Sequence, residues 1–181
     1  MQVHTTPLEG VLVFEANIYR DTRGSFLETY REDAFLGVGI EASFVQANRS
    51  FSWKNVIRGL HCQNPNPQGK FISVSYGAVF DVAVDIRPDS PTFRHWFGTE
   101  LTAENGRQLW IPVGFAHGFV ALEDSVVSYQ VTAPYYPPGD IAICWNDPAI
   151  GIAWPVENPI LSEKDLRAPL LGELEPDRLK W

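Results

Sequence analysis

Hydrophobic positions in this chain fall in short runs rich in valine, isoleucine and aromatic residues, and glycine and proline residues separate these runs. Such runs are typical of β-strands, and the separating residues are typical of turns. Within residues 24–30, the alternation places Phe26 and Glu28 on one face of a strand and Leu27 on the other. We predict strands at residues 11–14, 24–30, 44–48, 56–62, 70–75, 78–85, 94–97, 108–111, 118–122 and 125–132.

Two segments show a different pattern. We predict a short helix at residues 31–36. In the stretch after Pro159, we predict that a second short helix begins with Ser162 as its N-cap, since Asp165 follows three residues later. The proline-bearing tail beyond it predicts an irregular wrap over the domain.

The arrangement of the runs predicts one all-β domain that spans residues 1–181. Tyr76 and Gly77 separate two of the runs and indicate a hairpin turn. The sequence contains no internal repeat, low-complexity tract or linker. A series of short strands in one compact chain favours a two-sheet sandwich or jelly roll, with short C-terminal helical segments, over a parallel α/β fold.

The charge balance narrows the choice of partners. The 14 Lys and Arg residues against 22 Asp and Glu residues give a net charge of −8, which disfavours nucleic acid but leaves room for a basic pocket that binds one small anion. No apolar run approaches the roughly 20 residues of a membrane-spanning helix, and no export signal is visible. Cys62 and Cys144 make no disulfide framework, so we expect a cytoplasmic protein with no membrane partner.

Residues 37–42 fit the GxGxxA form of a dinucleotide-binding motif. That motif works only between a buried strand and the helix that follows it. Here a polar, helix-like segment precedes the motif and a predicted strand follows it. We therefore interpret these glycines as turn residues.

His61 is the first candidate for chemistry. It lies three residues after Arg58, so the two side chains face opposite sides of a regular strand unless Gly59 introduces a β-bulge. Bulges are common beside functional sites, and the alternative is a histidine that belongs to the core. We expect His4 and His95 to be structural or exposed.

His117 is the second candidate, because it lies in a PxGxxH pattern similar to the second motif of the cupin barrels. A metal-binding cupin needs about three or four protein ligands. In this chain, Gln63 replaces the second histidine of the first cupin motif, and no acidic residue follows before Asp81. We therefore expect no metal site.

Lys70 and Tyr129 are polar residues within apolar predicted strands. Either can be ordinary, since the lysine side chain snorkels and tyrosine is frequent in strands. Combined with an imidazole base and several arginines in a barrel without a metal, they suit proton transfer at a carbon next to a ketone.

The order of several motifs along the chain resembles the dTDP-4-dehydrorhamnose 3,5-epimerase family. The matching segments are DTRGSFLE at 21–28, FVQAN at 44–48, RGLH at 58–61, DIR at 85–87, SPTF at 90–93, WIPVGFAHGF at 110–119, YY at 135–136, WNDP at 145–148, IAWP at 152–155 and LSEKD at 161–165.

The resemblance implies a cupin-type jelly roll, usually a homodimer, that uses no metal or redox cofactor. It also implies an isomerase that inverts C3 and C5 of dTDP-4-dehydro-6-deoxy-D-glucose on the route to dTDP-L-rhamnose. By position, His61 is the base, Asp165 orients it, and Tyr129 is the acid on the opposite sugar face. Substrate contacts fall on Arg23, Glu28, Gln46, Asn48, Arg58, Lys70, His117, Asp140 and Lys164.

The sequence departs from the family at three positions. Cys62 replaces a more usual aromatic residue, Arg49 replaces histidine, and Asp140 lies near a position often held by glutamate. Because these positions flank the sugar pocket, one alternative is a single-carbon epimerase or ketoisomerase of a related nucleotide 4-keto-6-deoxy sugar. The others are a metal-dependent cupin and a sugar-binding barrel without catalysis.

Overall fold

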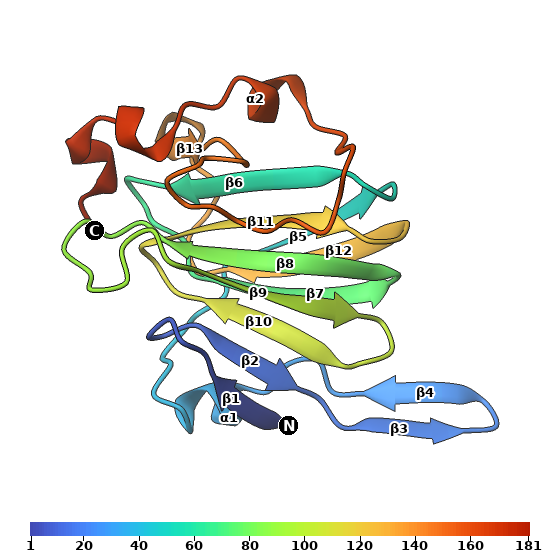
Figure 1. Cartoon of the computed structure of the whole chain (residues 1–181). Helices are drawn as coiled ribbons and strands as arrows, with labels where there is room; N and C mark the ends of the chain where they lie inside the picture. Colours follow the sequence, from blue (N-terminus) through green and yellow to red (C-terminus); the bar gives the residue numbers. More distant parts are fainter.

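The computed structural model describes all 181 residues, and its two main β-sheets pack face to face (Figure 1). The strands are β1 (Gln2–Thr5), β2 (Leu12–Glu15), β3 (Ile18–Asp21), β4 (Gly24–Leu27), β5 (Gln46–Ser52), β6 (Ile57–Gln63), β7 (Lys70–Tyr76), β8 (Ala78–Asp85), β9 (Trp96–Thr102), β10 (Arg107–Ile111), β11 (Phe115–Ala121), β12 (Ser125–Val131) and β13 (Asp140–Ala142). The helices are α1 (Glu32–Leu36) and α2 (Glu163–Leu166), with 3-10 turns η1 (Pro137–Gly139), η2 (Leu171–Glu173) and η3 (Pro176–Leu179).

The larger sheet has the strand order β1-β2-β10-β7-β12-β5, and the smaller sheet has the order β13-β6-β11-β8-β9. Neighbouring strands are antiparallel in both sheets. The chain crosses repeatedly from one sheet to the other, as in a jelly roll. The predicted all-β fold with short C-terminal helical segments is therefore confirmed.

The predicted hairpin at Tyr76 and Gly77 is wrong. β7 pairs with β10 and β12, whereas β8 pairs with β9 and β11, so these two residues carry the chain between sheets. Gly77 has a φ of 74°, and a side chain there would clash with the backbone of Asp124. The corner therefore needs glycine. Alternating polarity identifies a strand but does not identify the sheet to which it belongs.

Some element boundaries also differ from the prediction. The predicted strand at 24–30 ends at Leu27, and it pairs with β3, a strand that the hydrophobic pattern did not reveal. The β3–β4 hairpin projects from the body of the molecule (Figure 1) and exposes Tyr19 and Phe26. Residues 37–42 form turns and extended chain after α1, with Gly39 at a φ of 79°, so the turn interpretation is confirmed.

The core lies between the sheets and supports the cavity described below. It contains Ile72, Leu109, Phe119 and Val127, each at most 3% exposed, and each large apolar side chain contributes about 1.5–3 kcal/mol through burial. A second, aromatic cluster around Phe35 packs α1 against the outer face of the larger sheet.

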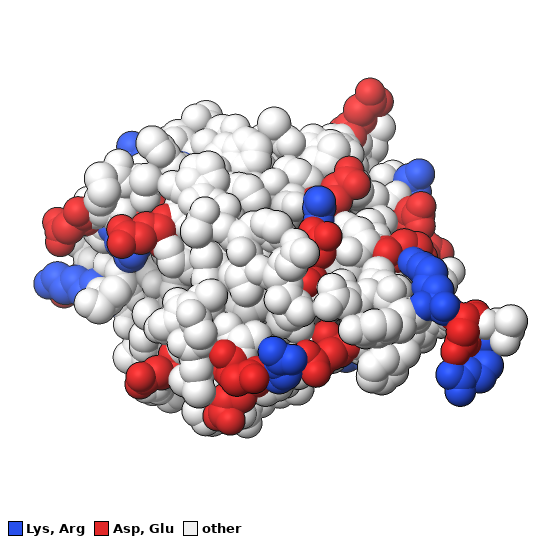
Figure 2. All heavy atoms as spheres, turned by 90° about the horizontal axis from the view of Figure 1, so that it is seen from below, with Lys and Arg blue, Asp and Glu red and all other residues white.

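Charged side chains are spread over the surface rather than gathered by sign. On the face shown in Figure 2, Lys and Arg side chains are interspersed with Asp and Glu around a broad uncharged area. No helix is both long and apolar enough to cross a membrane.

Candidate active site

A cavity of about 630 Å³ lies between the sheets, beside β13 and α2. This volume is within the usual range of about 300–1,000 Å³ for small-molecule sites. Both sheets contribute to its lining, which includes every predicted site residue except Arg23 and Glu28. Those lining residues are Gln46, Asn48, Arg58, His61, Lys70, His117, Tyr129, Asp140, Lys164 and Asp165.

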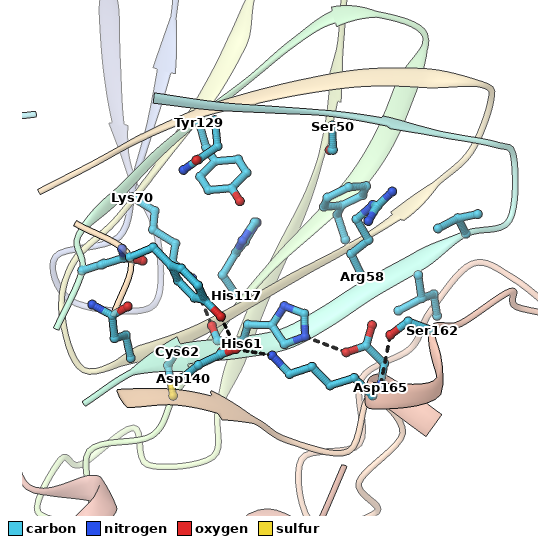
Figure 3. Close-up of a pocket in the computed structure, with 18 of the residues that line it drawn as sticks. Ser50, Arg58, His61, Cys62, Lys70, His117, Tyr129, Asp140, Ser162 and Asp165 are labelled. Carbon is cyan, nitrogen blue, oxygen red and sulfur yellow. Dashed lines mark hydrogen bonds and ion pairs between the residues drawn. The ribbon is translucent and has the colours of Figure 1, made fainter. Parts of the chain in front are cut away.

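His61 and Asp165 form a hydrogen-bonded pair at the cavity wall (Figure 3). Nε2 of His61 on β6 lies 2.6 Å from Oδ1 of Asp165 on α2. Burial disfavours the charged carboxylate, but the hydrogen bond and charge of His61 outweigh it and lower the pKa of Asp165. Because Asp165 accepts from Nε2, the imidazole keeps Nδ1 as the nitrogen that can take a proton.

The short helix α2 sets the position of Asp165. The hydroxyl of Ser162 accepts a hydrogen bond from the backbone N–H of Asp165 at 3.1 Å, which confirms Ser162 as the N-cap. The same cap leaves the carboxylate of Asp165 directed at His61. A local sequence signal thus fixes a contact between residues far apart in the chain.

Gly59 produces the predicted β-bulge between Arg58 and His61. The register of β6 and β11 shifts there, since His61 pairs with His117 but Arg58 pairs with Phe119. Gly59 has a φ of 127°, and a Cβ atom would lie 2.9 Å from the carbonyl oxygen of His117. Only glycine fits this close approach, and the bulge allows both Arg58 and His61 to line the cavity.

His117 forms a second histidine–carboxylate pair directly beside His61. Its Nε2 lies 3.0 Å from both carboxylate oxygens of Asp81, and the Asp81 side chain is fully buried. The predicted position of His117 inside the barrel is therefore confirmed, and its partner Asp81 is a residue that the sequence did not single out.

Lys70 brings a buried cation to the cavity from the larger sheet. Its ammonium group donates a hydrogen bond to the backbone carbonyl of His61 at 3.1 Å. Burial lowers the pKa of Lys70. A positive charge held with so little water around it interacts strongly with negative charge that develops nearby.

Tyr129 and His61 occupy opposite walls of the cavity (Figure 3). Tyr129 comes from β12 of the larger sheet, whereas His61 comes from β6 of the smaller sheet. Burial raises the pKa of Tyr129, so the phenol stays protonated at neutral pH and can donate a proton. A molecule between the walls would present one face to each group.

Polar side chains from β5 line the next part of the cavity. Gln46, Asn48 and Ser50 all line it, because residues two apart on a strand share a face. The amide of Gln46 donates to Oδ1 of Asn48 at 2.8 Å. Ser50 was missed by the sequence interpretation, although the alternation from Gln46 could have indicated it. Its buried hydroxyl has no hydrogen-bond partner.

Asp140 gathers two groups at the cavity. Its Oδ2 accepts hydrogen bonds from Nζ of Lys164 at 2.5 Å and from the hydroxyl of Tyr135 at 3.1 Å. Burial opposes ionisation of Asp140, but Lys164 outweighs it and lowers the pKa of the carboxyl. Tyr135 lines the cavity too and was not among the predicted site residues.

Arg23 and Glu28 lie outside this cavity. Arg23 sits in the β3–β4 hairpin region, pairs with Asp21 at 2.6 Å and has an 88% exposed side chain. Glu28 lies 3.7 Å from Arg31. The structure therefore does not bring these two residues to the other predicted site residues of the same chain.

The donor set around His61 is not that of a metal centre. No group of three or more His, Cys, Asp and Glu side chains is arranged to hold a metal ion. The amide of Gln63, at the position of the missing cupin ligand, binds the backbone of Asn66, Pro134 and Tyr136. Burial raises the pKa of the neighbouring Cys62 thiol to about 12, which keeps it protonated.

Residues 5–173 match the family model described as dTDP-4-dehydrorhamnose 3,5-epimerase. The chain is 50% identical over 177 residues to the protein of that name from Salmonella typhimurium, covering 96% of this chain and 97% of the relative.

Solved structures give the same result. The chain is similar to the dTDP-6-deoxy-D-glucose-3,5-epimerase from Legionella pneumophila, solved with dTDP-4-keto-L-rhamnose, at a TM-score of 0.95 and 43% identity over 98% of this chain and 96% of that one. For the dTDP-4-dehydrorhamnose 3,5-epimerase from Bacillus anthracis, solved with TDP and PPi, the TM-score is 0.90 and the identity 45%, over 93% of this chain and 98% of that one.

Proposed function

Because the chain belongs to the dTDP-4-dehydrorhamnose 3,5-epimerase family, we propose that its cavity converts dTDP-4-dehydro-6-deoxy-D-glucose into dTDP-4-dehydro-L-rhamnose. The chain is an isomerase, and residues 1–181 act as one epimerase domain. The roles of His61 as base and Tyr129 as acid rest on one observation: the imidazole and the phenol lie on opposite walls of one cavity.

The first step is removal of a proton next to the ketone. The C4 carbonyl acidifies the C3 and C5 hydrogens, and Nδ1 of His61 takes one of them as the general base. Electrons of the broken C–H bond move toward the carbonyl oxygen and give an enolate. Asp165, 2.6 Å from Nε2, stabilises the imidazolium ion that forms.

Cationic and hydrogen-bonding groups stabilise the enolate oxygen. Lys70 supplies a buried ammonium group, and His117, held by Asp81, supplies a ring nitrogen from the neighbouring strand. Their charge and dipoles are fixed before the reaction starts, so little reorganisation is needed when the oxyanion develops.

Inversion is completed from the other face. The Tyr129 hydroxyl donates its proton to the carbon, the carbonyl double bond re-forms, and the phenolate that remains regains a proton from solvent. The imidazolium of His61 releases its proton to solvent in turn. Repetition at the second carbon inverts both centres, with no net change in protons or electrons.

Arg23 and Glu28 complete the site in a second copy of the chain. Both lie on or beside the projecting β3–β4 hairpin, which exposes Tyr19 by 62% and Phe26 by 69%. Apolar groups so exposed are typical of contacts between protein chains, and a homodimer can place the hairpin beside the partner's cavity. Light scattering on the purified protein tests this assembly, and a monomer as active as any dimer would contradict it.

Turnover in D2O tests the reaction itself. Incubation of the protein with dTDP-4-dehydro-6-deoxy-D-glucose should place deuterium at both C3 and C5 of the product. Deuterium at one carbon alone would instead identify a single-carbon epimerase. In that case Cys62, which replaces a more usual aromatic residue in the cavity wall, would be the first position to test. No deuterium uptake at either carbon would contradict the proposed function.

A further inference from the structure

The C-terminal tail, residues 174–181, lies beyond the stretch that the family model matches. It nevertheless packs beside β13 (Figure 1). Leu179 is buried in the same hydrophobic cluster as Cys62 and Ile141. The amide of Asn64 donates to the backbone carbonyls of Arg178 and Lys180, at 3.1 and 2.7 Å. The tail is therefore fixed against the strand ends that border the cavity.

Arg178 connects this tail to the cavity rim. Its guanidinium donates a hydrogen bond to the backbone carbonyl of Asp140 at 3.2 Å. Asp140 begins β13, which has only three residues, lies at the edge of the smaller sheet and pairs with β6 alone. An edge strand has ladder hydrogen bonds on one side only, so each additional contact matters for its position.

The position of Asp140 in turn determines the positions of two cavity-lining side chains. Its carboxylate holds Lys164 at 2.5 Å and the Tyr135 hydroxyl at 3.1 Å, and all three residues line the cavity. Lys164 also precedes Asp165, the carboxylate that binds His61. A displacement of β13 would therefore move an ammonium group and a phenol out of the positions in which a substrate meets them.

We propose that Arg178 is a positioning residue for substrate binding, which acts through Asp140 to hold Tyr135 and Lys164 at the cavity. The proposal rests on the proposed function, because it concerns the substrate of that same cavity. Arg178 does not line the cavity, so it affects the affinity for the sugar nucleotide more than the proton transfers at His61 and Tyr129.

Steady-state kinetics of Arg178→Gln test the proposal. We expect KM for dTDP-4-dehydro-6-deoxy-D-glucose to rise by about 3-fold to 10-fold, the scale of one lost charge-assisted hydrogen bond acting indirectly, with kcat within about twofold of wild type. Arg178→Lys, which keeps a charge and a donor, should restore part of the affinity. Arg167→Gln is the matched control, since Arg167 is 82% exposed, pairs only with Glu163 and should leave both constants unchanged.

A double-mutant cycle separates positioning from a general loss of stability. In the Asp140→Ala background, Arg178→Gln should change KM by less than about twofold, because no side-chain acceptor for Tyr135 and Lys164 is left at position 140. An unchanged KM in Arg178→Gln, or an equal effect in both backgrounds, would overturn the proposal. If the glutamine variant does not fold, Arg178→Lys takes its place in the cycle. An inactive wild-type protein would contradict the proposed function instead.

Discussion

Two histidine–carboxylate pairs lie side by side in this molecule and differ in one physical respect. His61 and His117 are opposite each other on β6 and β11, and each binds a carboxylate through Nε2. The His61 side chain is 32% exposed, whereas the His117 side chain is 9% exposed and its partner Asp81 fully buried. Both histidines line the cavity, but the more exposed pair suits the proposed proton transfer, whereas the more enclosed pair also stabilises the structure.

The largest expected effect lies on the more exposed pair. His61→Asn removes the proposed general base but keeps a side-chain donor for Asp165, so the protein should fold while kcat falls by about 10²–10⁴-fold. Epimerisation followed by NMR measures the loss. His95→Asn is the matched control, since this exposed histidine lies outside the cavity, and near-normal turnover in His61→Asn would contradict the assigned role.

Substitution in the enclosed pair should lower stability as well as activity. His117→Leu leaves the carboxylate of Asp81 buried without its partner, which should lower the free energy of unfolding by about 3 kcal/mol. Urea denaturation of this variant and of His61→Asn compares the two pairs directly. Equal stability losses in the two variants would remove the distinction between them.

Substitution of Asp165, the hydrogen-bond partner of His61, should have a smaller effect on rate than substitution of His61 itself. Asp165→Asn should lower kcat by roughly 10-fold to 100-fold, because the imidazolium loses its counter-charge while the ring keeps its base. The pKa of Asp165 is lowered in the folded protein, so its ionic contribution to stability is present above the ordinary carboxyl pKa and lost as pH falls through the lowered value. The stability difference between wild type and Asp165→Asn should therefore shrink on acidification; a difference independent of pH would contradict a stabilising ionised carboxylate at Asp165.

Ser50 provides the mildest test of the cavity. Its buried hydroxyl has no hydrogen-bond partner within the protein, so we expect a substrate group to bind it. Ser50→Ala should raise KM about threefold to tenfold and should not destabilise the fold, since an unsatisfied polar group is removed. A lower stability with unchanged KM would show that the hydroxyl serves the fold instead.

Local signals predicted much of the fold and of the site. The runs of β-branched and aromatic residues predicted ten of the thirteen strands and missed β1, β3 and β13. Ser162 predicted the start of α2, because propensities and caps depend on near neighbours. Gly59 indicated the bulge that brings Arg58 and His61 to the same cavity.

Contacts between segments that are distant in the sequence could not be predicted from these local patterns. The corner at Gly77 was predicted as a hairpin because sheet membership depends on pairing across the whole chain. No local pattern distinguishes Asp81 from other polar residues, because its contact with His117 forms only when β8 and β11 pair. The separation of Arg23 and Glu28 from the cavity likewise follows from the projection of the β3–β4 hairpin, which no local pattern encodes.

The central claim is that His61 and Tyr129 serve opposite faces of one sugar, and deuterium exchange in D2O tests it most directly. In Tyr129→Phe, His61 can still remove a proton and return deuterium to the same face, so the recovered substrate should gain deuterium without inversion. In His61→Asn, neither exchange nor inversion should occur. Inverted product from Tyr129→Phe at near wild-type rate, or deuterium uptake by the substrate with His61→Asn, would contradict the account.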